Sequence, residues 1–228
     1  MPELTSVPLK ELDLALRVWR AAESGHPPAV LLHATGKTAA DWDHVIPAGR
    51  TVVAVDLRGH GASSWPGSYR LEEFAADVAG VLERLDLGPV DLVGHSLGGL
   101  VALLVASSRP ELIRRLVVED IGIPHPRTPS LPERPAGELP FDWRMVEQVR
   151  AQIDSPDVEA WRSVAARIVA PALVVAGGAA SPVPQEHVAL LASVIPGGRL
   201  VTIESGHLVH SSRPEEFCRV VSGFLDGV

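Results

Sequence analysis

The sequence contains only one cysteine, Cys218, among 228 residues. An internal disulfide is therefore excluded, and the composition suits a reducing compartment. The first residues lack a basic start followed by an apolar run, which is the pattern of a secretory signal. No uncharged apolar stretch approaches the length needed to cross a bilayer. We therefore expect a cytoplasmic protein that has no membrane partner.

Positive charge is also scarce. Lysine and arginine number 20 against 28 aspartates and glutamates, which gives a formal net charge of -8. Nucleic acids and anionic membranes require basic patches on a protein, so neither is expected as a partner. No group of His, Cys and Asp has the spacing of metal ligands, so no metal or other cofactor is implied. We expect a small-molecule substrate, and the sequence does not define the oligomeric state.

Short apolar runs of strand length recur along the whole chain. The first alternates with period two, as a half-exposed strand near a sheet edge does. The others are continuous, which is typical of buried parallel strands. The seven predicted strands cover residues 12–20, 29–34, 51–56, 90–95, 115–120, 172–177 and 199–204.

Amphipathic or wholly apolar stretches of helix length separate these runs, at 70–87, 97–112, 185–195 and 214–225. Strands that alternate with helices form a mostly parallel sheet with helices on both faces. We predict a doubly wound α/β fold of about eight strands. A single domain spans residues 1–228.

One segment, at about 122–168, interrupts the alternation. Residues 121–140 contain six prolines and cannot form regular structure, and two predicted helices follow at 142–154 and 156–169. The insert is either a lid over a site or a long connection. We favour a lid, because long insertions in compact domains are usually functional. Four aromatic residues are candidates either to line a pocket near the insert or simply to pack: Trp65, Phe141, Trp143 and Trp161.

The residues Gly94-His95-Ser96-Leu97-Gly98 join a predicted strand to a predicted helix. They match the Gly-x-Ser-x-Gly nucleophile elbow, in which the glycines allow a tight turn that exposes the serine hydroxyl above the sheet. We interpret Ser96 as a nucleophile. The alternative is a glycine-rich turn with a buried serine.

Four segments occur in the order known from one family: "LLHATGKTAADW" at 31–42, "DLRGHGASS" at 56–64, "VGHSLGG" at 93–99 and "ESGHLVHSSRPEEF" at 204–217. The chain resembles the α/β-hydrolase fold family, in its single-domain, lid-bearing serine esterase-like branch. The resemblance covers nearly the whole length.

The resemblance implies roles for particular residues. His207 is the expected base for Ser96, with His210 as a weaker candidate that more plainly suits a structural role. The backbone N–H groups of Leu97 and Thr35 are the expected oxyanion donors. His33-Ala34 stands where the family has His-Gly, which puts the shape of that loop in question.

The acid that should orient His207 is missing from its usual place. Ala180 occupies that position, and residues 171–185 contain no carboxylate. Some relatives carry the acid at the end of the preceding strand, where this chain has Glu119 and Asp120. Adjacent strand residues point to opposite faces, so one of the two is expected to face His207. The position after the apolar run favours Glu119, with Asp120 as the alternative; the remaining possibility is that neither acts and both cap a turn.

These observations predict a serine hydrolase that cleaves a carboxylic ester, lactone or thioester of a small molecule through an acyl-enzyme intermediate. Such an enzyme is carboxylesterase-, lactonase- or thioesterase-like. The alternative is a protein of the same fold with weak or no hydrolysis, either a ligand-binding receptor or a lyase or isomerase. The missing acid and the altered oxyanion loop motivate this alternative, and the fold itself hosts many functions.

Overall fold

A computed structural model describes residues 1–22, 25–45 and 49–227 of the chain. Its strands form one eight-stranded sheet in the order β1-β2-β4-β3-β5-β6-β7-β8. β2 runs antiparallel to β1 and β4, and the neighbours from β4 to β8 pair in parallel. The strands are β1 Glu3–Pro8, β2 Asp13–Trp19, β3 Ala29–Leu32, β4 Val52–Val55, β5 Val90–His95, β6 Ile113–Glu119, β7 Ala172–Ala176 and β8 Arg199–Thr202.

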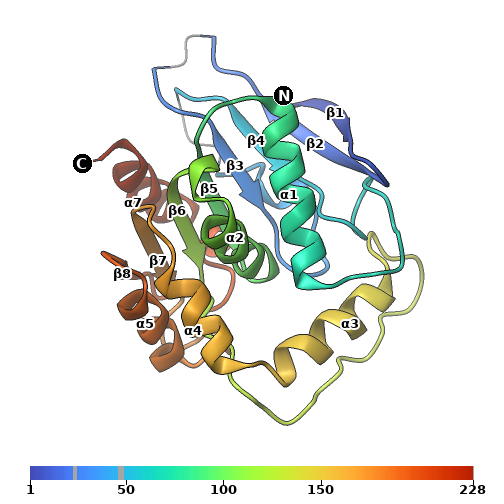
Figure 1. The fold of residues 1–228 in the computed structure, drawn as a ribbon, viewed down its shortest axis with the longest axis vertical. Coiled ribbons are helices and arrows are strands. Elements are labelled where there is room, and N and C mark those ends of the chain that lie inside the picture. Colours follow the sequence, from blue (N-terminus) through green and yellow to red (C-terminus); the bar gives the residue numbers. More distant parts are fainter. Residues whose placement is uncertain (23–24, 46–48, 228) are drawn as a thin grey trace.

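Helices cover both faces of this sheet (Figure 1), so the predicted doubly wound α/β fold is confirmed. Two short 3-10 helices, η1 Ala39–Trp42 and η2 Pro110–Leu112, accompany them. The α-helices are α1 Leu71–Leu85, α2 Leu97–Ser108, α3 Trp143–Asp154, α4 Val158–Ala166, α5 Gln185–Val194, α6 Val209–Ser212 and α7 Pro214–Asp226.

The sheet separates two apolar cores. Successive strand side chains point to opposite faces, so Leu92 of β5 packs with α1 and α2, whereas Val93 packs with Phe217 of α7. The same alternation continues through β6, where Val117 and Val118 belong to different cores. The face to which a β6 residue points therefore decides which helices it meets.

β1 is the strand that the apolar runs did not reveal. It pairs with β2 at the edge of the sheet, and Val7 is its one buried residue. Its remaining residues are exposed, so burial imposes no alternation of apolar and polar side chains that a reading of the sequence would detect.

The irregular first part of the insert, residues 121–140, follows β6 and passes around one end of the molecule beneath α3 (Figure 1). No helix or strand forms between Ile121 and Pro140, as the prolines predict. The segment is tied to α3, because the Arg127 N–H donates to the Asp154 carbonyl over 3.0 Å and Arg150 donates to the Ser130 carbonyl over 2.7 Å. The interpretation of the insert as a lid stays a prediction.

Within the part of the chain that the structure describes, no helix has both the length and the apolar character required to traverse a bilayer.

Candidate active site

Ser96 lies at the junction of β5 and α2 in a strained conformation, with φ 51° and ψ -115°. A side chain at Gly94 would place its Cβ 2.3 Å from the Gly98 carbonyl oxygen, and one at Gly98 would place it 2.3 Å from that of Leu32. Only glycine fits such a close approach, which explains both glycines of the elbow. Strain of this kind costs roughly 1 to 3 kcal/mol and is typical of functional sites.

His207 lies beside Ser96, in the loop between β8 and α6. Its Nε2 is 3.1 Å from the Ser96 Oγ, and its Nδ1 is 2.7 Å from Oδ2 of Asp120. A carboxylate only accepts hydrogen bonds, so the proton of the neutral imidazole sits on Nδ1 and leaves Nε2 to accept the serine hydroxyl. The structure therefore joins a hydroxyl, an imidazole and a carboxylate in one row.

Asp120 follows β6 with φ 46° and is fully buried. Besides His207, its carboxylate accepts the Gly177 N–H at 2.8 Å and the Ser181 hydroxyl at 2.5 Å. Burial alone would raise the pKa of Asp120, but hydrogen bonds from His207, Ser181 and Gly177 outweigh it and hold the pKa below its ordinary value. Asp120 is therefore charged at neutral pH and available to orient His207.

The expectation that Glu119 faces His207 is wrong. Glu119 lies two residues after Val117 and points to the same face of β6, toward α7. There its carboxylate accepts the backbone N–H of His210 at 3.0 Å and the His210 Nδ1–H at 2.8 Å. The alternative carboxylate, Asp120, occupies the place beside His207.

Glu119 and His210 belong to a buried polar network beneath the row of three side chains. The His210 Nε2 also lies 3.3 Å from Oδ2 of Asp41. Burial opposes a charged imidazole, but contacts with Asp41 and Glu119 outweigh it and raise the pKa of His210 to about 9. His210 therefore has the structural role that its sequence position suggested, as a cation between two carboxylates.

His95 connects this network to His207. Its Nε2–H donates to the His207 carbonyl oxygen over 2.8 Å, and its ring lies 5.2 Å from the ring of His210. Burial lowers the pKa of His95, so the ring is neutral and Nδ1 carries a lone pair. The loop that presents His207 is thereby held at its backbone as well as at its ring.

Asp41, His95 and His210 also form the one group of metal-ligand types that the described residues bring together. One ligand atom from each lies within 4.8 Å of the others. Sequence spacing did not reveal this group, because its members come from three distant segments. The raised pKa of His210 favours a proton over a metal ion on its Nε2.

The two expected oxyanion donors lie at the cavity beside Ser96. Leu97 and Thr35 both line it, and no protein acceptor among the described residues takes the backbone N–H of either. Leu97 is the first residue of α2, where N–H groups are free and the helix dipole favours negative charge. Two N–H donors are thus available near the hydroxyl.

Two buried histidines hold the loop that carries Thr35. His33 accepts the Leu57 N–H at 3.0 Å, and His60 accepts the Gly36 N–H at 3.2 Å. Burial lowers the pKa of His33 to about 4 and that of His60 to about 3, so both are neutral acceptors. Among the described non-glycine residues, positive φ occurs at 86, 96 and 120, so Ala34 has an ordinary backbone and replaces glycine without strain.

The cavity has a volume of about 530 Å³, in the range of small-molecule sites. The insert contributes residues 122–127 together with Val149, Arg150 and Ile153 of α3. The aromatic candidates Trp65, Phe141, Trp143 and Trp161 are not among its lining residues.

Residues 27–154, more than half of the chain, match the sequence model of a family described as the alpha/beta hydrolase fold. The chain is a member of the α/β-hydrolase fold family. It is 30% identical to an esterase of Mycobacterium tuberculosis, Rv0045c, over 88% of this chain and 83% of that protein. It is 26% identical to the mouse sn-1-specific diacylglycerol lipase ABHD11, over 87% and 81% of the two chains.

A solved structure of a hydrolase from Pseudomonas aeruginosa superposes on this α/β-hydrolase chain with a TM-score of 0.83. The two are 28% identical, and the match covers 99% of this chain and 98% of the other. The relatives named here are therefore hydrolases that share nearly the full length of the fold.

Sequence reasoning did not assign Ser181 and Gly177 to the site. A hydroxyl cannot replace the acid, so its residue type gives Ser181 no role, yet it donates to Asp120 from the segment where the acid is usually found. No motif distinguishes this serine, and its partner is 61 residues away in the chain.

Proposed function

We propose that the chain is a serine hydrolase that cleaves a carboxylic ester, lactone or thioester of a small molecule. Ser96 attacks the carbonyl carbon while His207 Nε2 takes the hydroxyl proton. Asp120 holds the Nδ1 proton of His207 and stabilises the imidazolium that forms. The Leu97 and Thr35 N–H groups stabilise the oxyanion of the tetrahedral intermediate.

The second half of the reaction uses the same groups. His207 gives its proton to the leaving alcohol or thiol as the carbonyl re-forms, which leaves an acyl ester on Ser96. A water molecule then loses a proton to His207 and attacks this ester. The acid is released and the Ser96 hydroxyl is restored.

One observation carries the proposal: a strained serine, an imidazole and a buried carboxylate lie in a row at 3.1 Å and 2.7 Å, beside a cavity. The names of the relatives agree with it, since one is an esterase and another a lipase that acts on diacylglycerol. The proposed steps require no metal or organic cofactor.

The alternative, a receptor-like, lyase or isomerase protein, depended on a missing acid and a distorted oxyanion loop. The contact of Asp120 with His207 and the ordinary backbone of Ala34 support the hydrolase over this alternative.

The test is hydrolysis of p-nitrophenyl butyrate by the purified protein and by its Ser96→Ala variant. We expect turnover that falls by about 10⁴-fold or more in the variant. Mass spectrometry of a wild-type sample quenched during turnover should find the acyl group on Ser96. Ester cleavage that survives the loss of the hydroxyl would contradict the proposal.

A further inference from the structure

The charge around the cavity contrasts with that of the whole chain. The formal net charge is -8, but apart from Asp120 and His207 the ionisable residues that line the cavity are all basic. No further carboxylate lines it within the described part of the chain. These basic residues are His125, Arg127, Arg150 and His187.

Arg150 makes no direct ion pair with a carboxylate of the described residues, and its charge acts on Asp154 only at longer range. Arg150 is half-buried on α3, and its Nε and Nη2 both donate to the neutral Ser130 carbonyl, at 3.1 Å and 2.7 Å. No carboxylate of the described residues lies within 4 Å of its guanidinium nitrogens. A guanidinium has five N–H groups, so Arg150 retains donors for a ligand.

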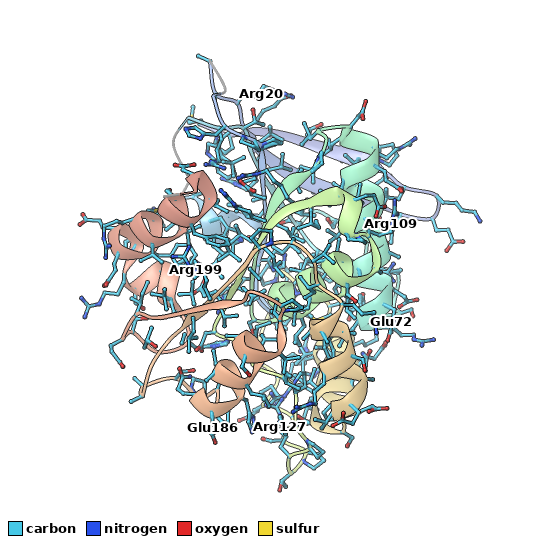
Figure 2. The ribbon with its side chains drawn as sticks, turned by 60° about the vertical axis from the view of Figure 1, so that its left-hand side comes forward. Arg20, Glu72, Arg109, Arg127, Glu186 and Arg199 are labelled. Carbon is cyan, nitrogen blue, oxygen red and sulfur yellow. The ribbon has the colours of Figure 1, made fainter. Side chains whose placement is uncertain are left out.

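Arg127 differs, because its charge is already compensated. Its Nε donates to Oδ1 of Asp154 at 2.5 Å, and Asp154 does not line the cavity. Figure 2 shows Arg127 at the end of the molecule opposite Arg20, where the insert wraps around the fold. Apart from Asp120, which is engaged with His207, two guanidinium groups against the Asp154 carboxylate leave one positive charge, which suits a singly charged anion.

Two histidines complete this basic part of the wall. The rings of His125 and His187 stack with centroids 3.8 Å apart at an angle of 15°. Burial and the neighbouring His125 lower the pKa of His187, so this ring is neutral at neutral pH. The pair therefore adds a flat surface and ring N–H groups to the wall.

The rest of the wall is largely apolar. The same cavity is lined by five apolar side chains, those of Leu100, Ile121, Ile123, Val149 and Ile153. A ligand that fits both parts has an apolar chain and one anionic end. Because the Ser96 hydroxyl is the proposed nucleophile, the ligand must also carry an ester-type carbonyl.

We propose that the substrate carries a free carboxylate, separated from the scissile carbonyl by an apolar chain, and that Arg150 binds this carboxylate. The inference rests on the proposed hydrolase function and assigns its substrate class. Arg150 is suited to the task because a guanidinium binds a carboxylate through two parallel hydrogen bonds.

The test compares the p-nitrophenyl hemiester of adipic acid with a neutral isostere in which the free carboxyl is a primary amide. We expect kcat/KM to be about tenfold higher for the hemiester, the scale of one charge-assisted pair. The preference should shrink as NaCl rises toward about 0.5 M, because salt screens the pair. Equal rates for the two esters, or a preference that ignores salt, would overturn the inference.

Variants of Arg150 assign the preference to this side chain. Arg150→Gln should remove most of it, and Arg150→Lys should retain part of it. Arg162→Gln is the matched control, since Arg162 is on α4 outside the cavity with a single long contact to Glu159. It should leave the preference unchanged, and loss of preference in this control would contradict the role of Arg150.

Binding to the Ser96→Ala protein separates this inference from the proposed function. Calorimetry should find the hemiester bound about tenfold more tightly than the amide. If binding shows this preference without turnover in the wild type, the hydrolase proposal fails and the carboxylate site stands. If both esters are cleaved through Ser96 without preference, the hydrolase stands and the carboxylate site fails.

Discussion

Two adjacent carboxylates at the end of β6 serve two different histidines. Asp120 binds the ring of His207, and Glu119 binds the ring and backbone of His210. The two contacts have different consequences. The first orients the proposed base, and the second fixes the loop that carries it.

We therefore expect Asp120→Asn and Glu119→Gln to have distinct effects. Asp120→Asn should lower kcat by roughly 10⁴-fold, because the amide neither fixes the tautomer of His207 nor stabilises its positive form. Glu119→Gln should lower kcat by no more than about tenfold, but cost roughly 1 to 3 kcal/mol of stability, because it weakens buried charge-assisted bonds. Steady-state kinetics and urea unfolding measure the two quantities.

The control for this pair is Glu204→Gln, a carboxylate close to His207 in sequence that instead accepts the Ala179 N–H at 3.1 Å. It should retain kcat within about threefold of the wild type. A larger loss in Glu119→Gln than in Asp120→Asn would show that the acid has been assigned to the wrong carboxylate.

Local motifs led to Ser96 and His207, but the position after the apolar run favoured Glu119 rather than Asp120 as the carboxylate that faces His207. Alternation predicts that neighbours in a strand face opposite sides, and it does not say which side holds the histidine. Which of the two carboxylates reaches His207 depends on where β6 ends and on the positive φ of Asp120. Neither is visible from residue type, since glycine is the usual residue in that conformation.

At the scale of elements, the junction of β5 and α2 depends on close backbone contact. We expect Gly98→Ala to destabilise the fold by roughly 1 to 3 kcal/mol or more, because its Cβ would lie 2.3 Å from the Leu32 carbonyl oxygen of β3. Urea unfolding monitored by circular dichroism measures this loss.

Gly223→Ala provides a matched control with the opposite sign. Gly223 lies inside α7, and a Cβ there would have no neighbour within 4 Å. Alanine should stabilise the helix by about 0.5 to 1 kcal/mol. Destabilisation of similar size in both variants would mean that the elbow has no special packing requirement.

Elements were predictable wherever burial imposes a pattern. Every apolar run expected to be a strand contains one, with ends that differ by a few residues. β1 was not predicted, because an exposed edge strand has no such pattern of apolar residues. The wall of the cavity was not predicted for a different reason. The contacts of Arg127 and Arg150 join an irregular segment to α3, and the path of that segment depends on such tertiary contacts.

At the scale of the whole molecule, the buried His210 makes stability depend on pH. Its pKa rises from 6.5 to about 9 on folding. A group with a raised pKa stabilises the fold fully below its unfolded pKa, and this contribution is lost as pH rises through the folded pKa. We expect the free energy of unfolding to fall between about pH 6.5 and 9, by at most roughly 3 kcal/mol from this group.

Urea unfolding at several pH values in this window measures the slope, and the His210→Gln variant isolates its source. The variant should be less stable near neutral pH and should have a flatter profile, because glutamine binds no proton. A wild-type slope that persists in the variant would assign the effect to another group.

Because the proposed acid, Asp120, directly follows β6, the segment after β7 need not supply a carboxylate. Ser181 donates to Asp120 there and accepts the backbone N–H of Val183, whereas the side chains of Pro182, Val183 and Pro184 line the cavity. The proposed function therefore divides chemistry and selectivity between two parts of the chain. Side-chain substitutions at residues 182–184 are accordingly the natural way to change which acyl groups are accepted, since these side chains line the cavity and transfer no proton in the proposed reaction.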